Sequence, residues 1–219
     1  MGSGRSLTVV SLGALVLGVV LTLALHVLPP SNEVNIVRRT ISQYALGPNK
    51  WIFDIAVLLI AAGSALAFAD LVRRGLVRPL SLPVALGALW TLSLLVVVWF
   101  TKTDWTVGPS TGGVIHRWAS VVGFVALPLA VLLVAPTAFA AAPGRRLAAR
   151  LLGVLSLSGL GVLLVGVLRM LAGGGPWWLF VPLGLVERFM ALTAVASLAV
   201  VLAGLLARAK SRDEVGVPV

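Results

Sequence analysis

The sequence predicts an all-α integral membrane protein, a bundle of six transmembrane helices. Apolar residues make up 59% of the 219 residues and charged residues only 11%, whereas soluble domains carry about a quarter charged residues. In addition, six apolar stretches are each long enough to cross a bilayer, which takes about 20 helical residues. These stretches are Leu7–Leu28, Trp51–Val72, Leu82–Phe100, Val114–Phe139, Leu151–Leu171 and Val181–Leu206.

The first apolar stretch is predicted to be a retained helix and not a signal peptide. It is longer than the roughly 7–15 apolar residues of a signal peptide, and no small-residue cleavage site follows it. Pro29-Pro30 ends it instead. Because the six stretches occupy most of the chain, residues 1–206 are expected to form a single transmembrane domain and residues 207–219 a short basic cytoplasmic tail.

Basic residues in the predicted loops indicate how the chain is oriented. Lysine and arginine concentrate in cytoplasmic loops, so the side that carries more of them is expected to be cytoplasmic. Four lie on one side, namely Arg38, Arg39, Lys50 and Lys102. Ten lie on the side of the two termini, namely Arg5, Arg73, Arg74, Arg78, Arg145, Arg146, Arg150, Arg208, Lys210 and Arg212.

Tryptophan positions agree with this orientation, because tryptophan concentrates where lipid meets water. Six of the seven map to the predicted outer boundary, namely Trp51, Trp99, Trp105, Trp118, Trp177 and Trp178. The net charge of +10 is divided among short loops, so it gives no support to a nucleic-acid partner. The chain has no cysteine, which excludes disulfides and thiolate metal sites, and we expect neither a metal nor a cofactor.

Ionisable residues gather at the outer end of the predicted bundle. Such groups are costly at membrane depth and usually mark a functional site or an ion pair. Glu187 is followed at helical spacing by small residues, which membrane helices favour where they pack closely, so its side chain is expected to point inward. An unpaired carboxylate there is unfavourable, and we expect Arg169 or Arg117 as its partner. The gathered residues are Asp54, Asp104, His116, Arg117, Arg169, Glu187 and Arg188.

At the other end, Asp70 precedes Arg73 and Arg74 by three and four residues. Residues at these spacings are neighbours on a helix surface. An ion pair along the helix is therefore expected there, with a structural role.

Three short motifs resemble those of one family. Arg38–Gly47, read as RRTISQYALG, is similar to the Ile-Ser-Glu-Tyr-Ala-Leu-Gly signature of the domain of unknown function 998 family. Two later motifs resemble further elements of this family in the same order. They are Asp104 followed by Gly113–His116, and Gly184–Arg188. Gln43 stands where the family has glutamate. Because the family resembles multi-pass prokaryotic membrane proteins of no established activity, the resemblance implies a topology and site positions but no reaction.

Two classes of function remain open, with a purely structural subunit as a third. In the first, which we favour slightly, arginines hold the anionic headgroup of a lipid or other amphiphile; the candidates are Arg38, Arg39, Tyr44, Arg117, Arg169 and Arg188. In the second, an intramembrane enzyme performs acid/base chemistry on a lipid-like or isoprenoid substrate; the candidates are Asp54, Asp104, His116 and Glu187.

The expected location is the cell (plasma) membrane of a bacterium, with a polar pocket on the extracytoplasmic side. The alanine-, leucine- and valine-rich spans and the many arginines are typical of a high-GC bacterium. A membrane lipid or amphiphilic ligand is the expected partner, and a homo-oligomer or a membrane-protein partner is considered in addition to it.

The distribution of basic residues generates a test of topology. A reporter fused after Val219 is expected to report the cytoplasm, and one inserted at Asn49 the opposite side, because the ten basic residues flank the predicted cytoplasmic ends. The measurement is a paired phosphatase and fluorescent-protein fusion assay. An extracytoplasmic signal from the fusion at Val219 would contradict the orientation.

Overall fold

The chain folds entirely into helices connected by turns and loops over the part that the computed structural model describes, residues 3–215, with side chains described for residues 5–208. Six helices in this range are long and apolar enough to cross a membrane, which confirms the predicted fold class. They are α1 (Ser3–Ala24), α2 (Lys50–Arg73), α3 (Leu82–Trp99), α4 (Thr111–Ala138), α5 (Pro143–Leu171) and α7 (Leu183–Val215). Three short helices lie in the connections: η1 (Ser31–Glu33), η2 (Ile41–Leu46) and α6 (Trp177–Phe180).

Prolines explain where several helices begin. Helix α5 begins at Pro143, ahead of the predicted Leu151, because the first turn of a helix tolerates a residue without an N–H group. Helix α7 begins at Leu183, directly after Pro182. It continues past residue 207, where the tail was predicted to begin, as far as Val215. The last four residues of that predicted tail, 216–219, lie outside the described residues.

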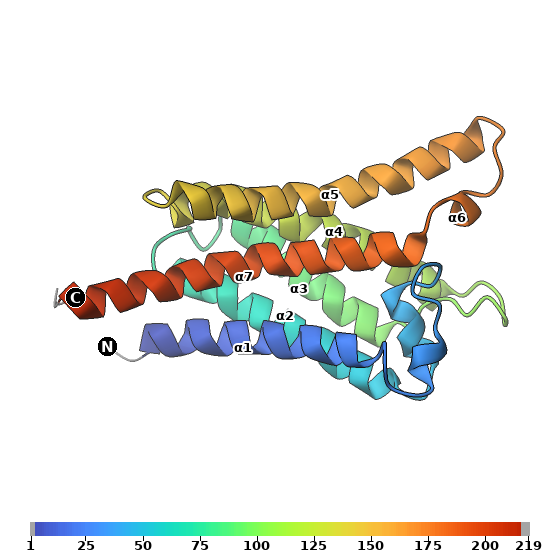
Figure 1. Ribbon diagram of the computed structural model, residues 1–219, viewed down its shortest axis with the longest axis horizontal. Coiled ribbons are helices and arrows are strands. Elements are labelled where there is room, and N and C mark those ends of the chain that lie inside the picture. The colour runs from blue at the N-terminus through green and yellow to red at the C-terminus, as the bar shows by residue number, and fades with distance from the viewer. Residues whose placement is uncertain (1–2, 216–219) are drawn as a thin grey trace.

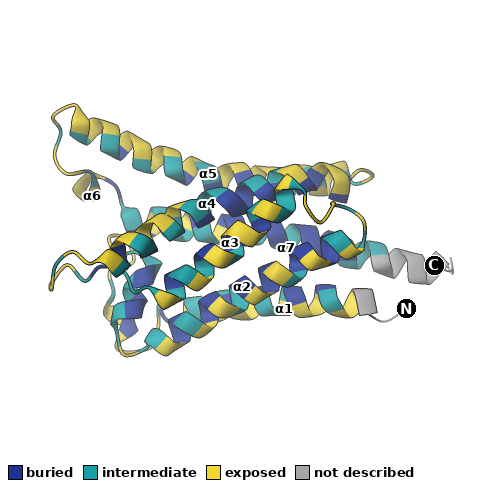
Figure 2. Ribbon diagram, turned by 180° about the vertical axis from the view of Figure 1, so that it is seen from behind, coloured by how far each residue is buried: buried dark blue, intermediate teal, exposed yellow. Residues whose placement is uncertain are grey.

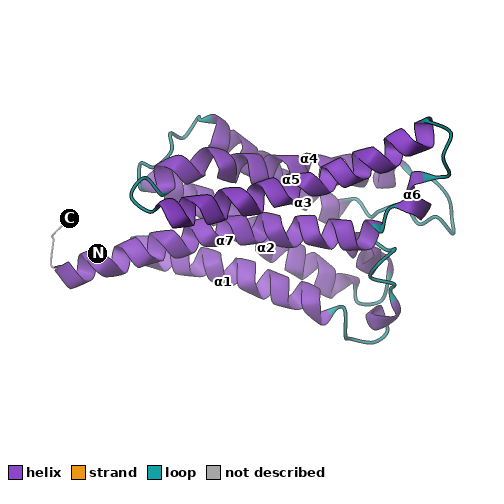
Figure 3. Cartoon of the chain, turned by 45° about the horizontal axis from the view of Figure 1, so that its top comes forward, coloured by secondary structure: helices purple, strands orange, loops and turns teal. Residues whose placement is uncertain are grey.

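Helix α7 is the central element of the bundle. It packs against α1, α2, α4 and α5, while α1 packs on α2, α2 on α3, and α3 on α4. The two ends of the chain lie at the same end of the bundle (Figures 1 and 3). We call this the terminal end, and the opposite end, formed by residues 25–49, 100–110 and 172–182, the distal end. Toward the distal end α5 tilts away from the bundle and its surface is largely exposed (Figures 1 and 2).

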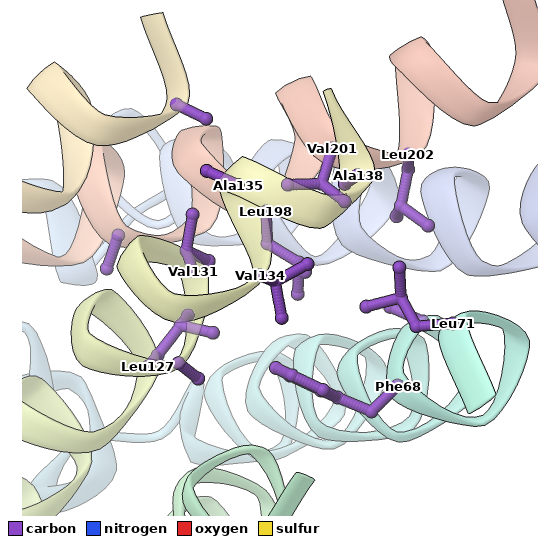
Figure 4. Packing of buried hydrophobic residues seen from close by; sticks show 14 of the residues in the cluster. Phe68, Leu71, Leu127, Val131, Val134, Ala135, Ala138, Leu198, Val201 and Leu202 are labelled. Carbon is purple, nitrogen blue, oxygen red and sulfur yellow. The ribbon is translucent and has the colours of Figure 1, made fainter. Parts of the chain in front are cut away.

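The terminal half of the bundle has a continuous apolar core. Side chains of α2, α4 and α7 meet there and are almost completely buried. Because lipid tails are as apolar as these side chains, the core is stabilised by close van der Waals packing and not by removal of apolar surface from water. Figure 4 shows part of this core, including Phe68, Leu71, Leu127, Val131, Val134, Leu198, Val201 and Leu202.

Small residues bring α1 and α2 into close contact. A Cβ atom at Gly18 would lie 2.8 Å from the carbonyl oxygen of Ala56, and one at Gly63 would lie 2.9 Å from that of Ser11. The Ser11 hydroxyl also donates to the Gly63 carbonyl at 2.6 Å. Glycine is therefore required at both contacts, as is common where membrane helices approach closely.

A buried carboxylate joins the same two helices near the terminal end. The Asp70 side chain is 0% exposed, and its Oδ2 accepts hydrogen bonds from the Thr8 hydroxyl at 2.6 Å and from Arg74 Nε at 3.0 Å. Arg74 also donates to the Thr8 hydroxyl oxygen at 2.8 Å. The expected ion pair along α2 is thus confirmed for Arg74, and it extends across to α1.

This network generates a stability prediction. Asp70→Asn is expected to lower the free energy of unfolding by about 1.5–3 kcal/mol, the usual contribution of a hydrogen bond to a charged group. Thermal unfolding in detergent measures the loss. The control is Arg73→Gln, because Arg73 is an exposed neighbour on the same turn. Equal melting temperatures for Asp70→Asn and the unaltered protein would contradict the stabilising role.

Candidate ligand-binding cavity

A cavity of about 200 Å³ lies inside the distal half of the bundle. Residues of α1, α2, α3, α4 and α7 line its walls, and η2 closes its distal end. Trp90 on α3 lines the cavity, and its indole N–H donates to the Ser64 hydroxyl of α2 at 3.0 Å. The walls between Trp90 and the distal end are mainly apolar, with Val19, Phe53, Val57, Leu94, Val97, Phe124 and Val195 among them.

The cavity reaches the side of the bundle at α1 and α7. Two of its lining side chains are far more exposed than the rest of its apolar wall: Leu23 on α1 is 57% exposed and Leu192 on α7 is 58% exposed. Both lie on surfaces that face lipid in a membrane-spanning bundle. These two side chains therefore mark where the cavity lies next to the side of the bundle.

The distal end of the cavity is closed by the first distal loop, residues 31–49, which packs against α2 and α7 through η2 (Figure 1). Ile41 and Ser42 of η2 line the cavity. The Ile41 N–H donates to Glu187 Oε2 on α7 at 2.6 Å. The bond of the Glu187 side chain to the described residues is made by Oε2, and none is made by Oε1, although Glu187 lines the cavity.

Arg188 holds the same loop from the neighbouring position on α7. Its Nη1 donates to the carbonyl oxygens of Ile36 at 3.1 Å and Arg39 at 2.7 Å, and its Nη2 to the Tyr44 hydroxyl at 3.3 Å. The loop lies so close to α7 that a side chain at Gly184 would collide with the carbonyl oxygens of Ile36 and Arg39. The guanidinium therefore bonds to several parts of one loop, for which its planar set of N–H groups is suited.

His26, just after α1, is a further partner of Arg188, whose Nη1 also donates to the Gly184 carbonyl at 3.0 Å. Arg188 Nε donates to His26 Nε2 at 2.8 Å, so this nitrogen carries a lone pair and no hydrogen. Nδ1 therefore carries the hydrogen, and it donates to the Thr22 carbonyl at 2.9 Å. Both ring nitrogens are thus hydrogen-bonded, and the ring also meets the buried Tyr44 ring edge to face, with 5.5 Å between centroids.

Lys102 supports the first distal loop from the second distal loop, residues 100–110. Its ammonium donates to the Thr40 hydroxyl at 3.1 Å and to the Gln43 side-chain oxygen at 3.0 Å. Burial lowers the pKa of Lys102 below its ordinary value, while the negative charge of Glu187 acts in the opposite direction. Residues on both sides of Ile41 are therefore bonded to Lys102, and Ile41 itself to Glu187.

His116 has a different position from the one expected for a catalytic partner of Glu187. It is 3% exposed and does not line the cavity. Its Nδ1 lies 2.7 Å from the Phe100 carbonyl and 3.2 Å from that of Val97, so Nδ1 carries a hydrogen and fastens α4 to the end of α3. Nε2 is buried without a hydrogen-bond partner among the described residues.

The two aspartates that were grouped with Glu187 also lie elsewhere. Asp54 pairs with Lys50, one turn earlier on α2, at 2.5 Å. Asp104 caps the second distal loop, where the hydroxyl and N–H of Thr106 donate to Oδ1 at 2.7 and 3.0 Å and lower the pKa of Asp104. With Arg39, Asp104 lines a second, open depression of about 500 Å³ between the first two distal loops.

The arginines do not converge on the cavity. The prediction that Arg169 or Arg117 pairs with Glu187 is wrong: Arg169 lies 4.4 Å from the centre of the Phe180 ring, and Arg117 lies 5.9 Å from that of Trp105. Arg38 donates to the Leu179 carbonyl at 2.8 Å. Arg169 lies on α5, which tilts away from α7, whereas Arg117 lies on α4 and Arg38 on the first distal loop, and each has an aromatic or carbonyl partner of its own.

Several residues of the site were not among those predicted from the sequence. His26, Lys102 and Trp90 carry no recognisable motif, and only the RRTISQYALG motif pointed to the part of the loop that closes the cavity. For Arg188, which was predicted, the direction of the side chain follows from that of Glu187, because adjacent residues on a helix point about 100° apart. With Glu187 facing the cavity, Arg188 faces α1 and the loop.

The bonds of Arg188 generate a prediction about the first distal loop. Arg188→Lys is expected to expose this loop, because one ammonium cannot replace a guanidinium that reaches His26, Tyr44 and two loop carbonyls. Limited trypsinolysis after the exposed Arg38 and Arg39 should accelerate at least about tenfold. This factor corresponds to a loss of about 1.4 kcal/mol from the free energy that keeps the loop closed.

The matched control is Arg169→Lys, which alters an arginine that contacts Phe180 and not the loop. Its cleavage rate after Arg38 and Arg39 should equal that of the unaltered protein. Equal rates for Arg188→Lys and Arg169→Lys would contradict the role of Arg188.

Comparison with known proteins gives one match. A family model described as "Protein of unknown function (DUF998)" matches residues 12–204. Neither the curated proteins nor the solved structures contain a match to this chain. The matched range contains most of the described bundle, from α1 to α7, together with the first distal loop and the cavity. This multi-pass membrane protein therefore belongs to the DUF998 family.

Proposed function

We propose that this protein binds a lipid or another amphiphile, with an apolar chain of the ligand in the distal cavity. The observation that carries the proposal is the division of the cavity lining. Apolar side chains surround Trp90 and the middle of the cavity, and Glu187, Arg188, His26 and Ser42 stand at its distal end. An amphiphile has the same division, and its polar end would lie level with these residues.

The size of the cavity limits what it can hold. An apolar cavity of about 150 Å³ admits a molecule the size of benzene, and this one measures about 200 Å³. It suits one chain, or part of one chain, and is too small for a lipid with two acyl chains inside the bundle. A second chain, where present, would remain in the membrane beside Leu23 and Leu192.

The position of the opening agrees with a ligand that arrives through the membrane. The exposed Leu23 and Leu192 flank the cavity on the side of the bundle, whereas the first distal loop covers its end. Exchange with the bilayer would then need no movement of the loop. By the distribution of basic residues, we place the cavity in the extracytoplasmic half of the cell membrane.

An intramembrane enzyme receives less support. Asp54, the alternative to Glu187 as proton donor or acceptor, and His116, the expected partner of either, do not line the cavity. Each is bonded to another part of the chain, Asp54 to Lys50 and His116 to the end of α3. General acid/base catalysis requires the groups to lie within hydrogen-bond reach of the reacting atoms, and only Glu187 of the three lines the cavity.

The proposal is tested by fluorescence quenching with a brominated chain. A bromine atom at the end of a twelve-carbon alcohol is expected to quench Trp90, because this indole lines the cavity. Subtracting the quenching of Trp90→Phe from that of the unaltered protein isolates the signal of Trp90 from those of the other tryptophans. Ala191→Phe should abolish this difference, since the added ring fills the cavity beside α7.

The control for this variant is Leu185→Phe, which adds a similar ring on the exposed face of α7. It should leave the Trp90 signal unchanged. A Trp90 signal that survives Ala191→Phe would contradict binding in the cavity. The absence of this signal from the unaltered protein would contradict it as well.

A further inference from the structure

We infer that the cavity selects amphiphiles whose polar end donates hydrogen bonds, an amine or a hydroxyl, and rejects those with a carboxylate or phosphate. The inference rests on the proposed function and names the ligand class of the same site. It replaces the expectation that arginines hold an anionic headgroup. Three features of the distal end of the cavity carry it.

The first feature is the free oxygen of Glu187. Oε2 accepts the Ile41 N–H, and Oε1 has no bond to any described residue while the side chain lines the cavity. A carboxyl oxygen that is withdrawn from water and has no donor is strongly stabilised by a donor, and most by a charged one. A ligand anion would instead place like charge against it.

The second feature is that the nearby cations are already bonded. Arg188, the only cationic residue that lines the cavity among the described residues, donates to His26, Tyr44 and loop carbonyls. Lys102 does not line the cavity and donates to Thr40 and Gln43 on the loop. An anionic headgroup would therefore have to share Arg188 with the bonds that hold the loop in place.

The third feature is the state of the neutral polar groups in the wall. The hydroxyls of Thr22 and Ser120 donate to carbonyl oxygens of their own helices, at Gly18 and His116, so only their oxygen lone pairs face other groups. Both nitrogens of His26 are bonded. Ser42 and Ser93, whose hydroxyls both donate and accept, do not discriminate. The neutral polar groups of the wall therefore leave more acceptors than donors available, and a ligand that donates hydrogen bonds complements them.

The experiment compares three twelve-carbon chains that carry the same terminal bromine and differ only in the polar end: an amine, an alcohol and a carboxylate. Quenching of Trp90, isolated with Trp90→Phe, gives the apparent affinity of each in the same detergent. The amine is expected to bind at least about tenfold more tightly than the carboxylate, the factor for one charge-assisted hydrogen bond, with the alcohol between them.

Glu187→Gln locates the selectivity. Glutamine keeps an oxygen for the Ile41 N–H but removes the negative charge. The ratio of the amine affinity to the carboxylate affinity should therefore fall toward one, while the affinity for the alcohol changes little. The matched control is Asp54→Asn, which removes a carboxylate of the same end of the bundle that does not line the cavity. Its preference should equal that of the unaltered protein.

The outcomes separate the two proposals. If none of the three chains quenches Trp90, the proposed function fails. If they bind but the carboxylate equals or exceeds the amine in the unaltered protein, the ligand class is overturned and binding stands. If the amine is preferred but Asp54→Asn abolishes the preference as fully as Glu187→Gln, Glu187 is not the selecting group and the inference is likewise overturned.

Discussion

The attachment of the first distal loop to α7 determines the architecture of the distal half. Glu187 bonds the backbone of Ile41, and Arg188 bonds His26, Tyr44 and two carbonyls of the loop. Two adjacent residues on one helix thus fix a loop about twenty residues long, as expected of short-range bonds between charged groups and backbone. Without these bonds, the cavity would have no closed distal end, and its polar residues would be exposed to water.

The two halves of the bundle differ in how completely they are packed. In the terminal half, side chains of α2, α4 and α7 fill the centre (Figure 4), and Asp70 joins α1 to α2 through bonds with Thr8 and Arg74. In the distal half, α5 tilts away and small residues such as Gly123 and Ala191 line the centre. The cavity therefore lies between the packed terminal half and the bonded first distal loop.

The cluster of ionisable residues at the distal end divides into groups with separate tasks. Glu187 and Arg188 contact the loop, His116 fastens α4 to α3, Asp54 pairs with Lys50, and Arg117 and Arg169 contact aromatic rings. A shared depth in the membrane brought them together in the sequence analysis, but depth is only one coordinate. Residues on different faces of different helices can lie at one depth and never meet.

The sequence by itself determined the fold class, the six spans and their approximate ends. Apolar length, proline position and charge distribution act locally, since a bilayer requires each span to satisfy its own backbone hydrogen bonds. The inward direction of Glu187 and the Asp70–Arg74 pair followed from helical spacing, which is also local. Partners across the bundle did not follow: the bond of Glu187 to Ile41, the role of His26 and the dispersal of the arginines depend on the tilt of α5 and the path of a loop. These are set by packing between segments far apart in the chain, which helical spacing within one segment does not specify.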